Sequence, residues 1–281
     1  MNLVAAVVTA GSPVRRALGV MLSIASMTPV WWVPVQHTLF RALWVIIAFS
    51  GMMRTVDLRR GHWTLKNRLV HVTSVVDERR LVRARPSADL VALGQTVLWL
   101  IPAWLAYYAM WALAVPVDAT GWLVRWSLGL VFVYTLSAGA YRILHFVYRA
   151  LGFIAPPLHI APAAARTVQE FWGERWNRTV SLWLGETFFR PLARRRKPLV
   201  GAFIAFLASA LLHAYVAWVA VGAWMGMWML VFFLAQAVII GLERAIRARA
   251  WSPWIGHAWT VAWMAGLSPM FTEPMARTLG V

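Results

Sequence analysis

His213 is the residue whose type and position are best suited to chemistry. It lies in the apolar run 199–221, where no other side chain titrates near neutral pH. About fourteen residues at about 1.5 Å each place it roughly 21 Å along a helix, past the middle of a hydrocarbon core about 30 Å thick. A neutral imidazole there can accept a proton as a general base. A histidine hydrogen-bonded between helices for packing fits the same position.

Two further polar features precede that run. Asn177, within FWGERWNR (171–178), carries an amide that can orient a histidine or hold a carbonyl, and a solvated interfacial asparagine also fits. The basic stretch RPLARRRK (190–197) can bind the phosphates of a nucleotide-like carrier. It can equally anchor the topology of neighbouring spans.

The composition places these residues in a membrane. The chain has 281 residues, of which 61% are hydrophobic, and its mean hydropathy is +0.64. Soluble domains contain about 45–50% apolar residues. The apolar residues form long runs between arginine-rich stretches, and many of the 19 tryptophans lie at the ends of these runs. This pattern predicts an all-α, polytopic transmembrane protein with a single domain over 1–281.

Seven runs are long enough to span a bilayer. They are 16–34, 37–53, 90–115, 121–148, 199–221, 223–243 and 254–272. Seven spans bring the basic segments 54–89, 190–197 and 244–249 to one face, which the positive-inside rule makes cytoplasmic. We therefore expect an integral protein of a bacterial inner membrane. The N-terminus has no basic region before its apolar run, so we expect it to be retained rather than cleaved as a signal peptide.

Residues 150–198 are too polar to cross the bilayer and too apolar for an ordinary loop. The stretch APPLHIAPA (155–163) is proline-rich and predicted to be non-helical. From Thr167 the spacing predicts an interfacial or re-entrant helix beside a cavity. Its apolar stripe is Val168, Trp172, Trp176, Val180 and Trp183, and its polar stripe is Glu170, Glu174, Asn177 and Ser181.

Several functional classes do not fit the sequence. The absence of cysteine excludes a thiol nucleophile, disulfides, iron–sulfur clusters and Cys-ligated zinc. The net charge of +17 does not indicate nucleic-acid binding, because the basic residues flank apolar runs instead of lining a soluble surface. Carboxylates are few and no HExxH pair occurs, so we expect no metal site. The other histidines are His37, His62, His71, His145, His159 and His257.

A family resemblance joins these features. The stretch FWGERWNRTVSLWLGETFFRPLARRR, followed by an apolar helix with ASALLHAYV, resembles the membrane-bound O-acyltransferase (MBOAT) superfamily. It is most similar to the bacterial branch of wax synthases, the long-chain-alcohol O-fatty-acyltransferases. The resemblance runs from about Phe171 to Val216, and the motif core covers about 167–221. Glu174 stands where the family pattern has a basic residue, and Ala210 stands where it has glycine.

The resemblance implies an O-acyltransferase in which His213 and Asn177 are the catalytic residues. It implies acyl-CoA as co-substrate, with no further cofactor, and a lipophilic hydroxyl acceptor such as a long-chain alcohol. We expect His213 to take the hydroxyl proton as the hydroxyl attacks the thioester, and Asn177 to orient His213 or stabilise the oxyanion. The predicted substrate-binding residues are Trp172, Arg175, Trp176, Arg178, Arg190 and Arg194.

A non-enzymatic function stays open as the alternative. His213 can serve a transporter as a proton relay, or a membrane scaffold as a packing group. The chain shows no inverted repeat of the kind common in transporters. Thioester-dependent product formation separates the enzyme from a transporter, which would show proton-coupled flux without product.

Overall fold

The computed structural model describes residues 1–9, 12–61, 63–113 and 115–281. Within this part of the chain the regular secondary structure is helical, apart from one pair of two-residue strands, and loops and turns join the elements. Residue 10 of the predicted N-terminal apolar run, His62, and Ala114 of the predicted span 90–115 lie outside the described residues. The chain divides into two compact units. Unit 1 comprises Met1–Leu81 with Val219–Val221, and unit 2 comprises Val82–Trp218 with Gly222–Val281.

Unit 1 is built from four helices, which pack Ala6, Leu58 and Val72 into a small core. Buried carboxylates in this unit are paired with arginines. Asp57 accepts from Arg54 at 3.3 Å and also from Arg60. The helices are α1 (Asn2–Val8), α2 (Pro13–Ala25), α3 (Thr38–Asp57) and α4 (Leu65–Thr73), with 3-10 turns at Thr28–Trp32, Leu58–Arg60 and Glu78–Arg80.

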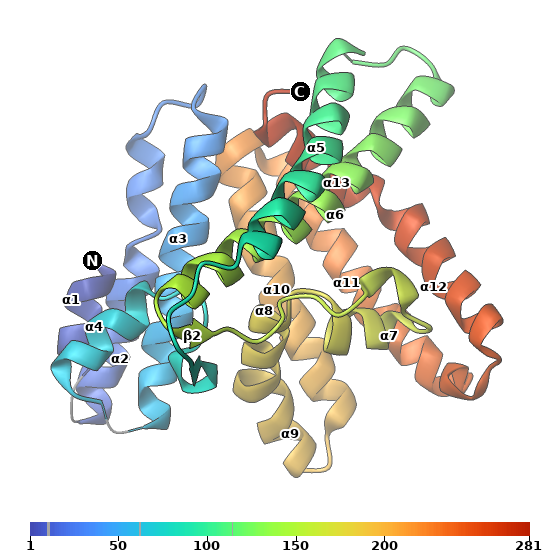
Figure 1. The fold of residues 1–281 in the computed structure, drawn as a ribbon. Helices are drawn as coiled ribbons and strands as arrows, with labels where there is room; N and C mark the ends of the chain where they lie inside the picture. Colours follow the sequence, from blue (N-terminus) through green and yellow to red (C-terminus); the bar gives the residue numbers. More distant parts are fainter. Residues whose placement is uncertain (10–11, 62, 114) are drawn as a thin grey trace. The chain divides into compact units, whose positions relative to one another are not determined.

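Unit 2 begins with a helical hairpin. Helices α5 (Leu90–Ala112) and α6 (Ala119–Ala150) lie side by side (Figure 1). The side chains of Asp89 and Asp118 cap their first turns by accepting backbone N–H bonds. Beyond the hairpin, strand β2 (Phe153–Ile154) pairs antiparallel with β1 (Val82–Arg83). This pairing ties the segment after α6 back to the segment before α5.

The second half of unit 2 holds two long apolar helices, α10 (Pro198–Val221), apart from its last three residues, and α11 (Ala223–Ala245). Gly222 joins them with a φ of 102°, a left-handed conformation that glycine adopts without steric cost. Two shorter helices follow the 3-10 turn Ala248–Ala250, namely α12 (Pro253–Leu267) and α13 (Pro269–Thr278). Helix α13 contacts both α11 and α6, which brings the end of the chain onto the core of unit 2.

Five helices among the described residues are long and apolar enough to cross a membrane. They are Thr38–Arg60, Leu90–Ala112, Ala119–Ala150, Pro198–Val221 and Ala223–Ala245. They confirm a helical, integral membrane protein, and they match five of the seven predicted spans. The exact count of seven is not confirmed. Only the first part of the predicted span 16–34 belongs to α2, which has 13 residues and ends at Ala25. The predicted span 254–272 is divided between α12 and α13. The 15 residues of α12 extend only about 22 Å, less than a hydrocarbon core of about 30 Å.

Candidate active site

The segment between α6 and α10 is helical but broken. It contains α7 (Val168–Glu170), a π-helical turn (Phe171–Arg175) and α8 (Arg178–Leu184). A second π-helical turn (Gly185–Phe189) leads into α9 (Arg190–Arg194). The prediction of one helix continuing from Thr167 is therefore wrong at Trp176–Asn177, where Asn177 adopts a left-handed φ of 39°. Asparagine tolerates this conformation better than most residues do, and the break changes the direction of the chain between Trp172 and Val180.

The proline-rich segment holds this break in place. The Ile160 N–H donates to the Arg175 carbonyl, and the Arg178 N–H donates to the Leu158 carbonyl, each at 2.9 Å. The prediction that 155–163 is non-helical holds for 155–161, whereas Pro162 and Ala163 belong to a 3-10 turn, Pro162–Ala164. The proline-rich segment thus forms hydrogen bonds with backbone groups that the interruption of the helix leaves without helical partners.

His159 supports Asn177 from the same segment. The Asn177 backbone N–H donates to His159 Nδ1 at 3.2 Å, and the His159 ring lies 4.5 Å from the Trp176 ring. Burial lowers the pKa of His159 to about 4, so this ring is neutral at pH 7 and Nδ1 keeps its lone pair. Sequence reasoning did not connect His159 with Asn177, because the bond depends on the left-handed turn.

His213 is held by its own helix. His213 Nδ1 lies 2.8 Å from the Ser209 carbonyl oxygen, one turn earlier in α10. A carbonyl only accepts, so we assign the ring proton to Nδ1, which leaves the lone pair on Nε2. The Phe233 ring of α11 lies 4.1 Å from the imidazole, measured between centroids. The geometry therefore suits Nε2 for accepting a proton.

His213 and Asn177 line one cavity of about 510 Å³, which we call the His213 cavity. This volume is within the range of small-molecule sites, about 300–1,000 Å³. Trp172, Trp176 and Arg190 also line it, so the cavity brings together five of the predicted site residues. Its longer polar side chains, apart from those of His213 and Asn177, are Gln169, Glu174, Arg190 and Arg244.

The predicted arginines divide into two groups. Arg190 lines the His213 cavity, whereas Arg178 and Arg194 are absent from the described residues that line it. Arg175 makes several contacts within the local fold. Its Nε donates to Glu170 at 2.7 Å, and its Nη1 donates to the carbonyl oxygens of Ile160 and Ala161 at 3.1 Å. Arg175 also lines a second, polar cavity of about 460 Å³ together with Arg166 and Arg249.

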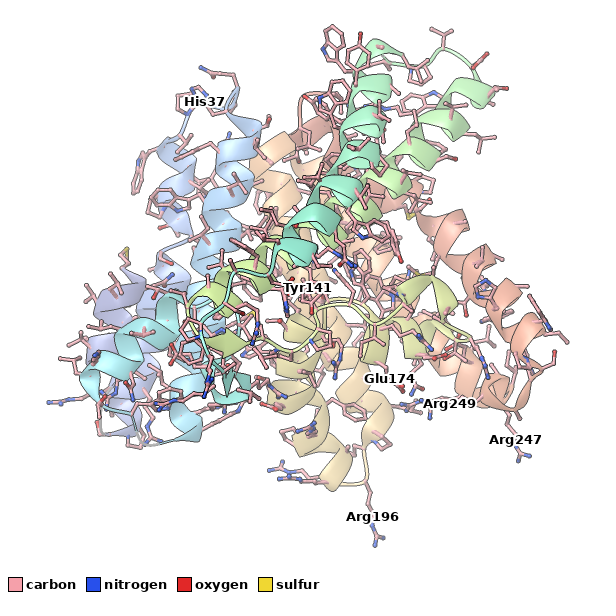
Figure 2. The ribbon with its side chains drawn as sticks, in the orientation of Figure 1. His37, Tyr141, Glu174, Arg196, Arg247 and Arg249 are labelled. Carbon is pink, nitrogen blue, oxygen red and sulfur yellow. The ribbon has the colours of Figure 1, made fainter. Side chains whose placement is uncertain are left out.

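Glu174 lines both the His213 cavity and the second, polar cavity. Its carboxylate accepts from Arg249 at 3.4 Å, and both side chains are exposed. Figure 2 shows Glu174 beside Arg249 at the side of unit 2 where Arg196 and Arg247 also project. The acidic residue that departs from the family pattern thus lines the His213 cavity together with Arg190 and Arg244.

Sequence reasoning also missed Arg244 as a site residue. It was counted only among the basic residues of 244–249, but it lines the His213 cavity, and its Nε donates to the Gln169 side chain at 3.2 Å. Its neighbour Glu243 is buried and bonds the start of α7. In the sequence, Arg244 is visible only as part of a Glu–Arg pair at the end of an apolar run. Such a pair does not indicate a hydrogen-bond partner 75 residues away.

An almost wholly apolar cavity of about 420 Å³ adjoins the His213 cavity, and we call it the apolar chamber. The two share Trp172, Trp176 and Phe271 in their walls. The remaining lining comes mainly from α6 and α12, including Leu130, Val131, Val261 and Met264. An aromatic wall therefore separates a cavity with polar groups from a lipophilic one.

Comparison with known families agrees with this arrangement. Residues 155–235 match the membrane bound O-acyl transferase family. The match covers the proline-rich segment, the broken helix, α10 and the first half of α11, which together supply most of the His213 cavity. The match supports a relationship to the MBOAT superfamily over these residues. A search among curated proteins found no significant match.

Proposed function

We propose that this protein transfers an acyl group from acyl-CoA to the hydroxyl of a lipophilic acceptor such as a long-chain alcohol, as in the wax-synthase-like branch. The observation that carries the proposal is the His213 cavity, which is lined by His213 and Asn177 and also by Arg190 and Arg244. No covalent enzyme intermediate is required.

His213 is the proposed general base. The acceptor oxygen attacks the thioester carbonyl carbon, and its proton passes to His213 Nε2. As the C–S bond breaks, the proton is returned to the leaving sulfur, so the products are an ester and a free thiol. The bond between Nδ1 and the Ser209 carbonyl supports this assignment, because it leaves Nε2 as the accepting nitrogen. Asn177 is proposed to orient the reacting groups or to donate to the oxyanion.

The two cavities suit the two substrates. Arg190 and Arg244 can bind the phosphates of the CoA carrier, with charge-assisted hydrogen bonds. The apolar chamber suits an alkyl chain, because water is a poor competitor for an apolar lining. Trp172 and Trp176 lie between the two and are proposed to set the position of the reacting atoms. We further propose one domain over 1–281 in a bacterial inner membrane, with the basic segments on the cytoplasmic face.

The test is product formation by purified protein in a lipid bilayer. The protein is incubated with an acyl-CoA and a long-chain alcohol, and ester and free CoA are measured by mass spectrometry and thiol assay. We expect equal amounts of both products, and none above background for a folded His213→Ala variant. Full activity of that variant would exclude His213 as the base. Proton-coupled flux of a solute without ester would favour a transporter.

A further inference from the structure

Glu243 makes an unusual set of contacts for an acidic residue near the end of an apolar helix. Its side chain is 4% exposed. One carboxylate oxygen accepts from the Val168 N–H at 2.6 Å and from Trp259 Nε1 at 3.1 Å. The other oxygen accepts from the Gln169 N–H at 3.0 Å. Glu243 therefore bonds two successive backbone donors and one ring donor.

These backbone donors begin the broken helix. The first N–H groups of a helix have no partner within the helix and must find one elsewhere. Thr167 satisfies one of them, since its hydroxyl accepts from the Glu170 N–H at 2.9 Å. Glu243, which belongs to α11, accepts from the two preceding N–H groups, those of Val168 and Gln169. A carboxylate is also the favoured charge at a helix start, because the backbone dipoles are positive there.

The same face of α11 holds the next turn of the broken helix. Gln236 is fully buried, and its side-chain oxygen accepts from Trp172 Nε1 at 3.1 Å. Between Gln236 and Glu243, Ile239 and Ile240 pack against Val168. The start of the broken helix is thus attached to α11 by hydrogen bonds to Gln236 and to Glu243. Apolar contacts with the two isoleucines lie between these hydrogen bonds.

We propose that Glu243 is a positioning residue for the acyl-transfer site. It fixes the first turn of the broken helix on α11. Trp172 and Asn177, which follow Val168 by four and nine residues, are thereby held where they line the His213 cavity. The inference rests on the proposed function for its catalytic consequence. A glutamine cannot replace the carboxylate fully, because its amide nitrogen would face the Gln169 N–H, and two donors repel.

The first measurement is independent of activity. The natural chain has no cysteine, so a Ser181→Cys reporter on α8, in the wall of the His213 cavity, gives a single labelling site. Its rate of reaction with a polar maleimide is compared in three backgrounds, Glu243, Glu243→Gln and Glu243→Ala. We expect Glu243→Ala to raise the rate about five-fold or more, and Glu243→Gln to give an intermediate value, because unpaired N–H groups release the first turn.

The matched control is Asp77→Asn. Asp77 is another buried carboxylate, 6% exposed, and it accepts three N–H bonds from Arg79 in unit 1. It lines none of the cavities described above. We expect this variant to label at the natural rate within about two-fold, even where its melting temperature falls, because residues that share no contact partners act independently. The control separates general destabilisation from release of the broken helix.

The second measurement is the steady-state kinetics of the cysteine-free variants. We expect kcat to fall in the order natural, Glu243→Gln, Glu243→Ala, with a smaller change in the KM for acyl-CoA, since Arg190 still lines the cavity. Natural rates of labelling and turnover in both variants would overturn the proposal, and so would faster labelling with unchanged kcat. If the natural protein forms no ester, the acyl-transfer function fails, while the labelling rates still decide whether Glu243 holds the segment.

Discussion

His213 and His71 are both histidines on helices that pack against apolar neighbours, yet their surroundings differ in the property that permits chemistry. His213 lines a cavity of about 510 Å³ and has one ring nitrogen held by the Ser209 carbonyl. His71, in unit 1, is 0% exposed, and its ring lies 4.5 Å from the Trp63 ring. Among the described residues neither of its ring nitrogens has a hydrogen-bond partner. Burial by itself therefore does not define a site, because a general base needs space for the group whose proton it takes.

The largest effect is expected at His213. A His213→Gln variant keeps a polar side chain of similar size but loses the base, so we expect kcat to fall about 10²- to 10⁴-fold. The measurement is ester formation per folded protein. His71→Phe serves as the comparison and should retain activity within about two-fold, because residues that share no contact partners act independently. Equal losses in the two variants would remove the distinction between a cavity histidine and a packed one.

A smaller effect is expected at Asn177, where backbone and amide can be separated. Asn177→Gly keeps the left-handed turn but removes the amide, whereas Asn177→Ala removes the amide and also strains the turn. We expect both to lower kcat about 10-fold or more, with the alanine variant more severely affected and less stable. Natural turnover in Asn177→Gly would show that only the backbone conformation matters there.

Arg244 and Arg194 allow the same comparison, between a residue inside the cavity and one outside it, for binding of the CoA carrier. Arg244 lines the His213 cavity and Arg194 does not. We expect Arg244→Ala to raise the KM for acyl-CoA about 10-fold, since a charge-assisted hydrogen bond contributes about 1.5–3 kcal/mol. Arg194→Ala should change the KM less than about two-fold, because an exposed charge is screened by salt. The reverse order would mean that the carrier binds outside this cavity.

The smallest effect on activity, but a distinct one on stability, is expected for His71→Phe as a function of pH. Burial lowers the pKa of His71 to about 4 from 6.5, so the unfolded chain binds a proton more readily over this window. The natural protein then has its full stability above about pH 6.5 and loses it as the pH falls towards about 4. At pH 5 the loss from this group is about 2 kcal/mol.

Phenylalanine does not titrate, so His71→Phe should lose less thermal stability than the natural protein between pH 7 and pH 5. It also removes two unpaired polar atoms from a buried site, which favours the variant at both pH values. Melting temperatures in detergent micelles provide the measurement. Parallel pH profiles for the two proteins would contradict the buried, neutral state of His71.

Much of the fold followed from hydropathy, because a bilayer imposes length and polarity on each span. Five predicted spans match helices of sufficient length among the described residues. The other two predicted spans are not confirmed, because the helices found there are short. Residues 254–272 are apolar throughout much of their length, yet Pro269 begins a new helix after Ser268. Periodicity similarly suggested one continuous helix from Thr167, whereas the chain turns at Asn177.

The site was predictable in part, since residues close in sequence or on one helix carry recognisable spacing. Trp172, Trp176, Asn177, Arg190 and His213 were selected from the sequence, and all line one cavity. Their catalytic and binding functions stay predictions. Arg175 was assigned to substrate, but it is bonded to Glu170 and to two carbonyl oxygens. Spacing identifies a charged residue without revealing which groups compete for it.

The sequence by itself determined that the chain is an integral membrane protein, that a lone histidine lies within an apolar helix, and that a motif of the MBOAT type precedes it. These properties depend on hydrophobicity, charge and short-range order, which are local. Only the tertiary structure decided that Glu243 and Gln236 hold the broken helix, that Arg244 joins the cavity, and that Arg178 and Arg194 do not line it. Those contacts join residues as many as 75 positions apart, and they depend on the direction the chain takes after a single left-handed residue.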